Sequence, residues 1–226
     1  MRGPLRYFAW PLLLVAVGVG CESTTPGSRL EEPLPPAALD MPTAADGALQ
    51  TVVLSGGCFW GVEAVFEHVK GIKDVVSGYS GGAAETARYD LITTGTTGHA
   101  ESVSITFDPA QITYGQILRV FFSVAHDPTQ VDGQYPDDGP HYRSNIFYAN
   151  DQQRTVALAY ITQLEATRLF PRRIATRVDP LVAFYRAEDD HQDYLANHLT
   201  EPYIVTFDLP RLALLERFFP ELYRTR

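Results

Sequence analysis

The sequence predicts an α/β domain in which a mixed sheet and flanking helices form a two-layer sandwich. Short apolar runs typical of strands alternate along the chain with segments whose apolar residues recur at helical spacing. The chain has 226 residues, of which 45% are hydrophobic and 20% are charged. This is the composition of a globular protein, and a chain of this length commonly folds around a single core.

The first half of the domain begins with a predicted strand over residues 51–54, which two glycines end at positions 56 and 57. Apolar residues then recur at helical spacing from Val62 to Val69, so we expect a helix that Gly71 ends. Strands are predicted at residues 74–77 and around Ile105. The glycine- and threonine-rich loop over 78–98, between them, is long enough to indicate a function.

The second half repeats this alternation. A capping box formed by Thr113 and Gln116 predicts the start of a helix that reaches about Val124. The remaining predicted elements are a long polar loop over 126–142, a strand over 145–148, a helix from about Asp151, a strand over 176–178 and a helix over 188–199.

Residues 1–21 have the pattern of an export signal. Two arginines precede an apolar run over residues 7–19, and small residues lead directly to Cys21. The pattern resembles a bacterial lipoprotein signal, so we expect a lipid on Cys21 and an exported protein in the cell envelope, anchored to the membrane. An ordinary signal peptide and an uncleaved anchor are the alternatives.

Residues 22–48 contain five prolines and few large apolar residues, which predicts an extended tether. The globular domain is therefore expected over 49–226.

Charge and cysteine content exclude several classes of function. Asp and Glu total 27 against 18 Lys and Arg, a net charge of −9 that repels nucleic acid. The two cysteines, Cys21 and Cys58, are too few for a disulfide scaffold or a cysteine-based metal site. The histidines do not have zinc-site spacing either, so we expect no bound metal.

Cys58 is the candidate nucleophile because it stands where the first strand meets the first helix. Unpaired N–H groups and the helix dipole at such a position favour the thiolate, the nucleophilic form of the side chain. The alternative is an inert, buried cysteine.

The motifs around Cys58 and further along the chain resemble those of the A-type methionine sulfoxide reductases. They occur in one order and span about residues 51–198: GGCFWG at 56–61, GYSGG at 78–82, GHAESVSITFDP at 98–109, HDPT at 126–129 and DDGPHYRS at 137–144. The resemblance implies a ferredoxin-like two-layer fold. It also implies reduction of the S epimer of methionine sulfoxide, free or in peptides.

The resemblance also implies roles for individual residues. Cys58 matches the nucleophile, and Glu101 matches the carboxyl that protonates the sulfoxide oxygen. Tyr89 and Tyr142 match the phenols that hydrogen-bond this oxygen, and Asp137 matches a carboxylate that orients the polar end of the pocket. Because the sulfoxide oxygen leaves badly as hydroxide, attack by sulfur needs such an acid, and burial can keep a carboxyl protonated.

Phe59 and Trp60 match the apolar walls that receive the substrate methyl group. Tyr135 departs from the family pattern, which often has glycine at this position. The larger side chain predicts a narrower rim of the substrate pocket. Each of these residues also has a purely structural alternative. The aromatic residues could belong to the core or the rim, Glu101 could be a solvated side chain, and Asp137 could be a turn residue.

No cysteine follows Cys58, so we expect a cycle with one catalytic cysteine and no bound cofactor. An external thiol must attack the Cys58 sulfenic acid, and a thioredoxin-like protein, a glutaredoxin-like protein or a small thiol could supply it. The expected partners are oxidised proteins or peptides and this reductant, and the expected state is a monomer.

Two other functions remain as alternatives. One is a cysteine hydrolase or acyltransferase, which needs a histidine bonded to Cys58 as its base. The other is a non-enzymatic envelope lipoprotein that binds methionine-like ligands.

Overall fold

The structure is a computed structural model that describes Gly3 and residues 30–42 and 47–226. The predicted signal over 1–21, with Cys21, lies outside the described residues, apart from Gly3. So do residues 22–29 and 43–46 of the predicted tether. No helix in the described part of the chain is both long and apolar enough to cross a membrane.

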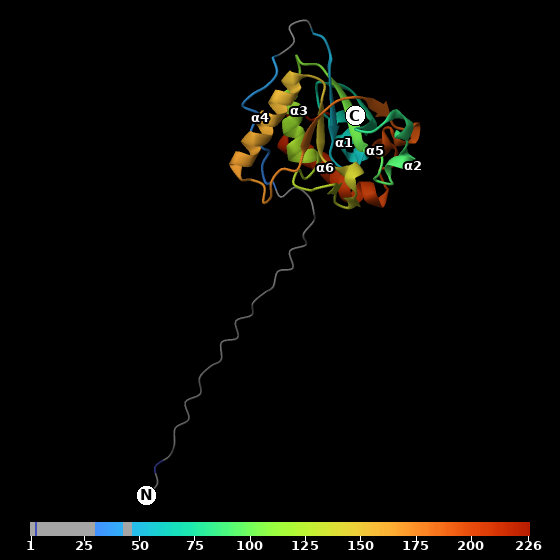
Figure 1. The fold of residues 1–226 in the computed structure, drawn as a ribbon. Coiled ribbons are helices and arrows are strands. Elements are labelled where there is room, and N and C mark those ends of the chain that lie inside the picture. The colour runs from blue at the N-terminus through green and yellow to red at the C-terminus, as the bar shows by residue number, and fades with distance from the viewer. Residues whose placement is uncertain (1–2, 4–29, 43–46) are drawn as a thin grey trace.

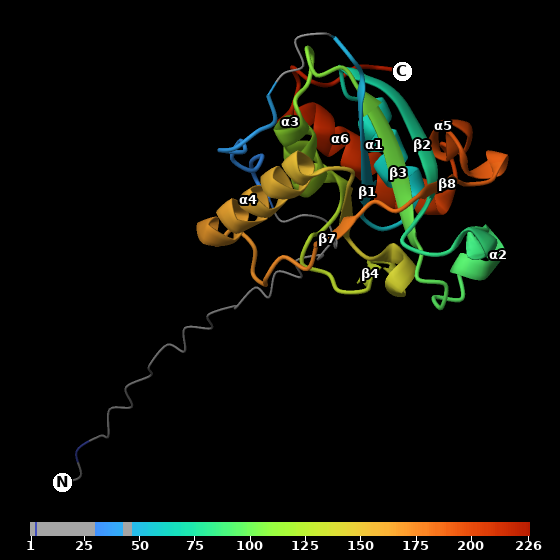
Figure 2. The same cartoon turned by 45° about the horizontal axis from the view of Figure 1, so that its top comes forward.

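A six-stranded sheet forms one layer of the fold (Figure 2). Its strand order is β7-β6-β1-β3-β2-β8, and every neighbouring pair is antiparallel except β6 and β7. The strands are β1 (Gln50–Ser55), β2 (Ile72–Ser80), β3 (Ala100–Phe107), β6 (Asn145–Tyr148), β7 (Arg177–Pro180) and β8 (Phe184–Arg186). The predicted mixed sheet is therefore confirmed.

The central elements follow the chain order β1-α1-β2-β3-α3-β6, with α1 at Phe59–Glu67 and α3 at Tyr114–Val120. Their strands lie in the order β6-β1-β3-β2 and are all antiparallel to their neighbours. This arrangement is the ferredoxin-like, split βαβ topology that the family resemblance implies.

The other helices are α4 (Asp151–Thr167), α6 (Leu209–Phe218) and the short α2 (Tyr89–Ile92) and α5 (Tyr194–Asn197) (Figure 1). Two π-helical turns, η2 (Phe121–Ala125) and η5 (Ile204–Asp208), follow α3 and precede α6. Smaller elements are the hairpin β4 (Gly133–Gln134) and β5 (Asp137–Asp138) and the 3-10 turns η1 (Ala84–Thr86), η3 (Pro140–Tyr142) and η4 (Asp189–His191).

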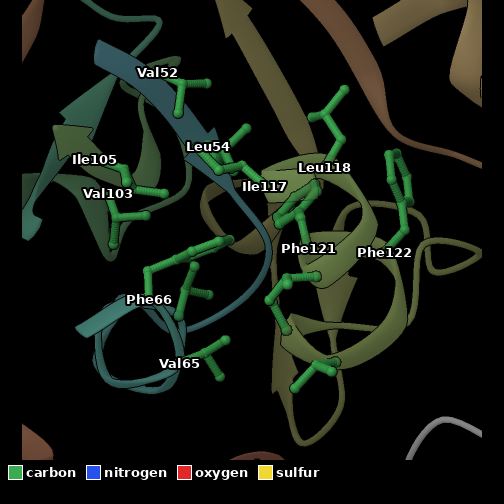
Figure 3. Packing of buried hydrophobic residues seen from close by; sticks show 14 of the residues in the cluster. Val52, Leu54, Val65, Phe66, Val103, Ile105, Ile117, Leu118, Phe121 and Phe122 are labelled. Carbon is green, nitrogen blue, oxygen red and sulfur yellow. The ribbon is translucent and has the colours of Figure 1, made fainter. Parts of the chain in front are cut away.

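The main core lies between the sheet and the helices (Figure 3). Val52 and Leu54 of β1 point into it and meet apolar residues of α1 and α3, such as Phe66 and Ile117. Val53 belongs to a separate, smaller cluster, as the alternation of side chains along a strand requires. The core thus fixes the start of α1 against the end of β1.

Three predictions of secondary structure are wrong. Helix α1 ends at Glu67 rather than near Gly71, because Val69 instead makes a β-bridge with Tyr223 near the C-terminus. The helix predicted over 188–199 is broken into η4 and α5, and Asp193 between them has a φ of 52°. The loop predicted over 78–98 contains the end of β2, η1 and α2.

The described part of the Pro-rich segment packs on the domain instead of extending from it. Leu34 is fully buried, and its backbone N–H donates to Ser123 Oγ at 3.1 Å while its carbonyl accepts from Arg119 Nε at 2.6 Å. The Pro35 carbonyl accepts from Tyr160 Oη of α4 at 2.7 Å. The tether expectation is therefore wrong for residues 30–42, which run beside α3 and α4 (Figure 1).

Candidate active site

Cys58 occupies the N-cap of α1, directly after the turn that leaves β1. Its side chain is nearly buried, with 6% of its surface exposed. Gly57 in the turn has a φ of +95°, and a Cβ there would come within 2.6 Å of the Gln134 side chain. The glycine therefore lets the β4–β5 hairpin pack closely beside the cysteine.

Burial decides the charge of this thiol in the free protein. Desolvation is the largest effect on the Cys58 pKa and raises it well above its ordinary value. The carboxylates of Glu101, Asp208 and Asp137 raise it further, whereas the backbone N–H of Trp60 lowers it. The expectation that the helix N-terminus yields a thiolate is thus wrong for the free protein, in which the thiol is neutral.

Glu101 on β3 is the acid beside Cys58. Its carboxyl is 2% exposed, and Oε2 accepts a hydrogen bond of 3.0 Å from the backbone N–H of Phe59, the first residue of α1. Burial raises its pKa to about 8; the Phe59 N–H lowers it and the charge of Asp137 raises it. Glu101 therefore carries a proton near neutral pH.

Tyr89 and Tyr142 approach the same centre from two loop segments, at the start of α2 and the end of η3. Burial raises the pKa of Tyr89 to about 12, and the charges of Glu101 and Cys58 raise it next. The pKa of Tyr142 is raised by burial and then by the same two groups. Among the described residues neither hydroxyl has a hydrogen-bond partner, so both can donate to a ligand.

Asp137 on β5 joins this cluster. It is half-buried, and its Oδ2 accepts a hydrogen bond from the hydroxyl of Tyr203. Burial raises the Asp137 pKa, whereas the bond from Tyr203 and the charge of Arg211 lower it. Because its charge acts on Cys58 and Glu101, Asp137 lies close enough to set the electrostatic potential of the site.

Phe59 and Trp60 differ in exposure. The Phe59 ring is 1% exposed and packs against Tyr79 and His191, at centroid distances of 5.9 and 5.3 Å. Trp60 is only partly buried; it stacks on Tyr194 at 3.6 Å and donates from Nε1 to His191 Nδ1 at 3.2 Å. Both rings are therefore held rigidly beside the cysteine.

The structure adds residues that sequence reasoning missed. Asp208 is the last residue of η5 and Tyr203 is the residue before η5, and both lie near Cys58. Arg211 of α6 forms an ion pair of 3.3 Å with Asp208. Asp208 is 1% exposed, and the charge of its carboxylate acts on Cys58. No motif marks these positions, since only the folding of the C-terminal segment onto α1 brings them there.

Glu188 is a further residue that the sequence did not single out. It accepts from the Tyr79 hydroxyl at 2.7 Å and from the backbone N–H of Tyr89 at 3.0 Å. Burial would raise the Glu188 pKa, but these hydrogen bonds outweigh burial, and the pKa is lowered. Glu188 thus ties the first turn of α2, and with it Tyr89, to the sheet.

The histidines serve the structure rather than the thiol. His126 Nε2 bonds Ser144 Oγ at 2.7 Å, and burial lowers the His126 pKa to about 3. His99 Nε2 bonds the Ala83 carbonyl at 2.9 Å. Within the described ranges no histidine is hydrogen-bonded to Cys58, and no group of three or more His, Cys, Asp or Glu could hold a metal ion.

Comparison with known proteins agrees with this geometry. The family described as peptide methionine sulfoxide reductase matches residues 50–218. A relative from Mesorhizobium japonicum, named peptide methionine sulfoxide reductase MsrA 2, is 53% identical over 180 residues, which are 80% of this chain and 92% of the relative. One of the same name from Synechocystis is 47% identical over 200 residues, covering 88% and 92% of the two chains.

Solved structures agree as well. Methionine sulfoxide reductase A of Corynebacterium diphtheriae has a TM-score of 0.58 at 33% identity, over 76% of this chain and 85% of that one. The reduced form of Mxr1 from Saccharomyces cerevisiae has the same TM-score of 0.58 at 26% identity, over 71% and 91%. The chain therefore belongs to the peptide methionine sulfoxide reductase family.

Proposed function

We propose that this protein reduces the S epimer of methionine sulfoxide, free or in peptides and proteins, with Cys58 as nucleophile and Glu101 as acid. The buried Glu101 carboxyl, which accepts a hydrogen bond from the backbone N–H of Phe59, the residue after Cys58, is the observation that carries the proposal. A carboxyl held neutral by burial is the donor that a poor leaving oxygen needs.

The first half of the reaction transfers oxygen to the thiol. The Cys58 sulfur attacks the sulfoxide sulfur and forms an S–S bond, while Glu101 gives its proton to the oxygen. The oxygen then transfers to the Cys58 sulfur: the S–O bond of the substrate and the new S–S bond break as an S–O bond forms on Cys58. The oxygen ends on Cys58 as a sulfenic acid, methionine is released, and the thiol proton restores the carboxyl of Glu101. The sulfur of Cys58 is oxidised and that of the substrate is reduced, so atoms and electrons balance.

The two phenols stabilise charge on the oxygen during this step. Tyr89 and Tyr142 have free hydroxyls that can donate to the oxygen, and such donors contribute about 2–4 kcal/mol each to transition-state binding. Asp137, through its bond from Tyr203, orients the polar side of the site. Phe59 and Trp60 line the apolar side, where sulfur and methyl groups favour aromatic contacts.

An external thiol completes the cycle. It attacks the sulfenic acid and water leaves, which gives a mixed disulfide with Cys58. A second thiol then attacks this disulfide, so the Cys58 thiol is restored and the reductant leaves as a disulfide. No cysteine follows Cys58 in the chain, which supports a cycle with one catalytic cysteine. A thioredoxin-like or glutaredoxin-like protein or a small thiol can fill this role, and a single subunit suffices for every step.

The decisive experiment offers the protein each sulfoxide epimer of a blocked methionine together with dithiothreitol. We expect the blocked methionine to form from the S epimer alone, as followed by chromatography. Turnover of an activated ester without any reduction of either sulfoxide would contradict the proposal and favour a cysteine hydrolase.

We also propose that the protein is an exported lipoprotein of the cell envelope, supported by the pattern of residues 1–21. Mass spectrometry of the mature protein from membranes should find Cys21 as the first residue, with a diacylglyceryl group on its sulfur. A protein that begins elsewhere, or an unmodified Cys21, would contradict this anchoring.

A further inference from the structure

A row of aromatic side chains leads outward from the catalytic cysteine. Trp60 lies two residues after Cys58, and the edge of its ring meets Tyr203 at a centroid distance of 6.1 Å. Tyr203 contacts Phe207 at 5.2 Å, and Phe207 contacts Tyr135 at 5.9 Å. These four residues, which we call the aromatic strip, come from α1, the C-terminal segment around η5 and the β4–β5 hairpin.

The inner end of the strip belongs to the catalytic cluster. Trp60 follows the nucleophile by two positions, and the hydroxyl of Tyr203 bonds to Asp137. The outer end is open to solvent, because Tyr135 is 51% exposed and Phe207 is only partly buried. The strip therefore leads from the catalytic cluster to the protein surface.

Tyr135 is fixed at this place although its ring is exposed. Its backbone N–H donates to Gln130 Oε1 at 2.7 Å. Gln130 Nε2 in turn donates to Gln134 Oε1 at 3.1 Å, and Gln134 itself is 4% exposed beside the turn that carries Cys58. A large apolar ring held in solvent on a rigid hairpin is typical of a binding surface.

The geometry points to an oxidised polypeptide as the occupant of the strip. A methionine side chain is short and the Cys58 side chain is only 6% exposed, so the backbone of a bound peptide must lie against the protein surface at the edge of the cluster. We infer that Tyr135 and Phe207 bind the residue next to the methionine sulfoxide, with a preference for an apolar side chain. This inference rests on the proposed reduction of methionine sulfoxide.

The preference has a physical reason. Two neighbouring aromatic rings gain free energy by covering apolar surface, whereas the carboxylate of Asp137, which is hydrogen-bonded to Tyr203 of the strip, repels an acidic side chain.

The test compares three S-sulfoxide substrates with dithiothreitol as reductant: a blocked methionine sulfoxide, a peptide with leucine beside the sulfoxide and the same peptide with glutamate instead. The wild-type protein should have the highest kcat/KM for the leucine peptide. In Tyr135→Ser the ratio of kcat/KM for the leucine peptide to that for the blocked amino acid should fall about threefold to tenfold, through KM.

Tyr135→Phe, which keeps the ring, should retain the wild-type ratio, and Val182→Ser serves as a matched control because Val182 is 90% exposed outside the strip. An unchanged ratio in Tyr135→Ser would overturn the inference while leaving the proposed function intact. Equal losses on all three substrates would overturn it as well. If no substrate is reduced by the wild-type protein, the proposed function itself fails. If a protein thiol replaces dithiothreitol and Tyr135→Ser loses activity only then, the strip binds the reductant instead and the peptide assignment is overturned.

Discussion

Cys58→Ser is expected to reduce methionine formation from the S-sulfoxide to the uncatalysed background, a loss of about 10⁴-fold or more for a catalytic nucleophile. A serine hydroxyl cannot accept the sulfoxide oxygen, because the alcohol has no counterpart of the sulfenic acid. Chromatographic assay of the blocked methionine with dithiothreitol measures the loss. Cys21→Ser provides the control, since Cys21 lies outside the catalytic domain and the soluble variant should keep its activity.

The oxidation state after one turnover tests the rest of the same scheme. With sulfoxide but no reductant, Cys58 should become a sulfenic acid that a dimedone reagent labels, with one methionine formed per protein. No disulfide should appear, because Cys58 is the only cysteine in the catalytic domain. A disulfide between Cys21 and Cys58 would contradict the cycle with one catalytic cysteine, and residual activity in Cys58→Ser would contradict the role of the thiol.

The part of the site built from local sequence could be predicted. The apolar run of β1, the two glycines and the helical spacing after Cys58 place the cysteine at a helix N-cap, where the structure has it. Thr113 and Gln116 form the predicted capping box, with Gln116 N–H donating to Thr113 Oγ1 at 3.2 Å. Such signals are read within a few residues, so one sequence suffices to find them.

The part that depends on distant packing could not be predicted. Tyr203 and Asp208 are ordinary residues of a C-terminal segment, and only its packing on α1 brings them to Cys58. Residues 30–42 read as a tether because prolines dominate their composition. Yet Leu34 fills a site beside Ser123, and the carbonyls around it find donors on α3 and α4.

The charge of the thiol shows how two physical effects compete at one position. The helix N-terminus favours a thiolate, but at 6% exposure the loss of hydration and the nearby carboxylates outweigh it. The resting site therefore holds a neutral thiol and a neutral carboxyl. Proton transfer from Glu101 to the sulfoxide leaves a charge that the thiol proton can neutralise, so that substrate binding and thiol activation are coupled.

Glu101→Gln tests that coupling directly. Glutamine can still accept the hydrogen bond from Phe59 N–H, but it cannot donate a proton as an acid. We expect kcat/KM for the S-sulfoxide to fall about 10²–10⁴-fold, the usual contribution of a general acid. The variant should fold, since glutamine has nearly the same shape.

The pH dependence separates the loss of an acid from a change in packing. Wild-type kcat/KM should decline as pH rises through about 8, because the active carboxyl is protonated and its pKa is about 8 in the folded protein. In Glu101→Gln this decline should disappear.

The free energy of unfolding should also fall as pH rises. The pKa of Glu101 in the folded protein lies above the ordinary value of 4.5, so the folded state binds more protons than the unfolded state. The wild-type free energy of unfolding therefore falls as pH rises from about 4.5 to about 8. Urea denaturation should therefore show Glu101→Gln gaining stability relative to the wild type over this interval.

Glu63→Gln is the matched control for both measurements. Glu63 of α1 is also 2% exposed, and burial raises its pKa to about 8, but Glu67 and Asp193 are the acidic groups that act on it. Its replacement should give the same gain in relative stability between pH 5 and 8 and leave the alkaline decline of kcat/KM in place. If Glu63→Gln removed that decline, or Glu101→Gln retained it, the group that titrates in catalysis would not be Glu101, and the proton would have to reach the sulfoxide from another donor in the cluster.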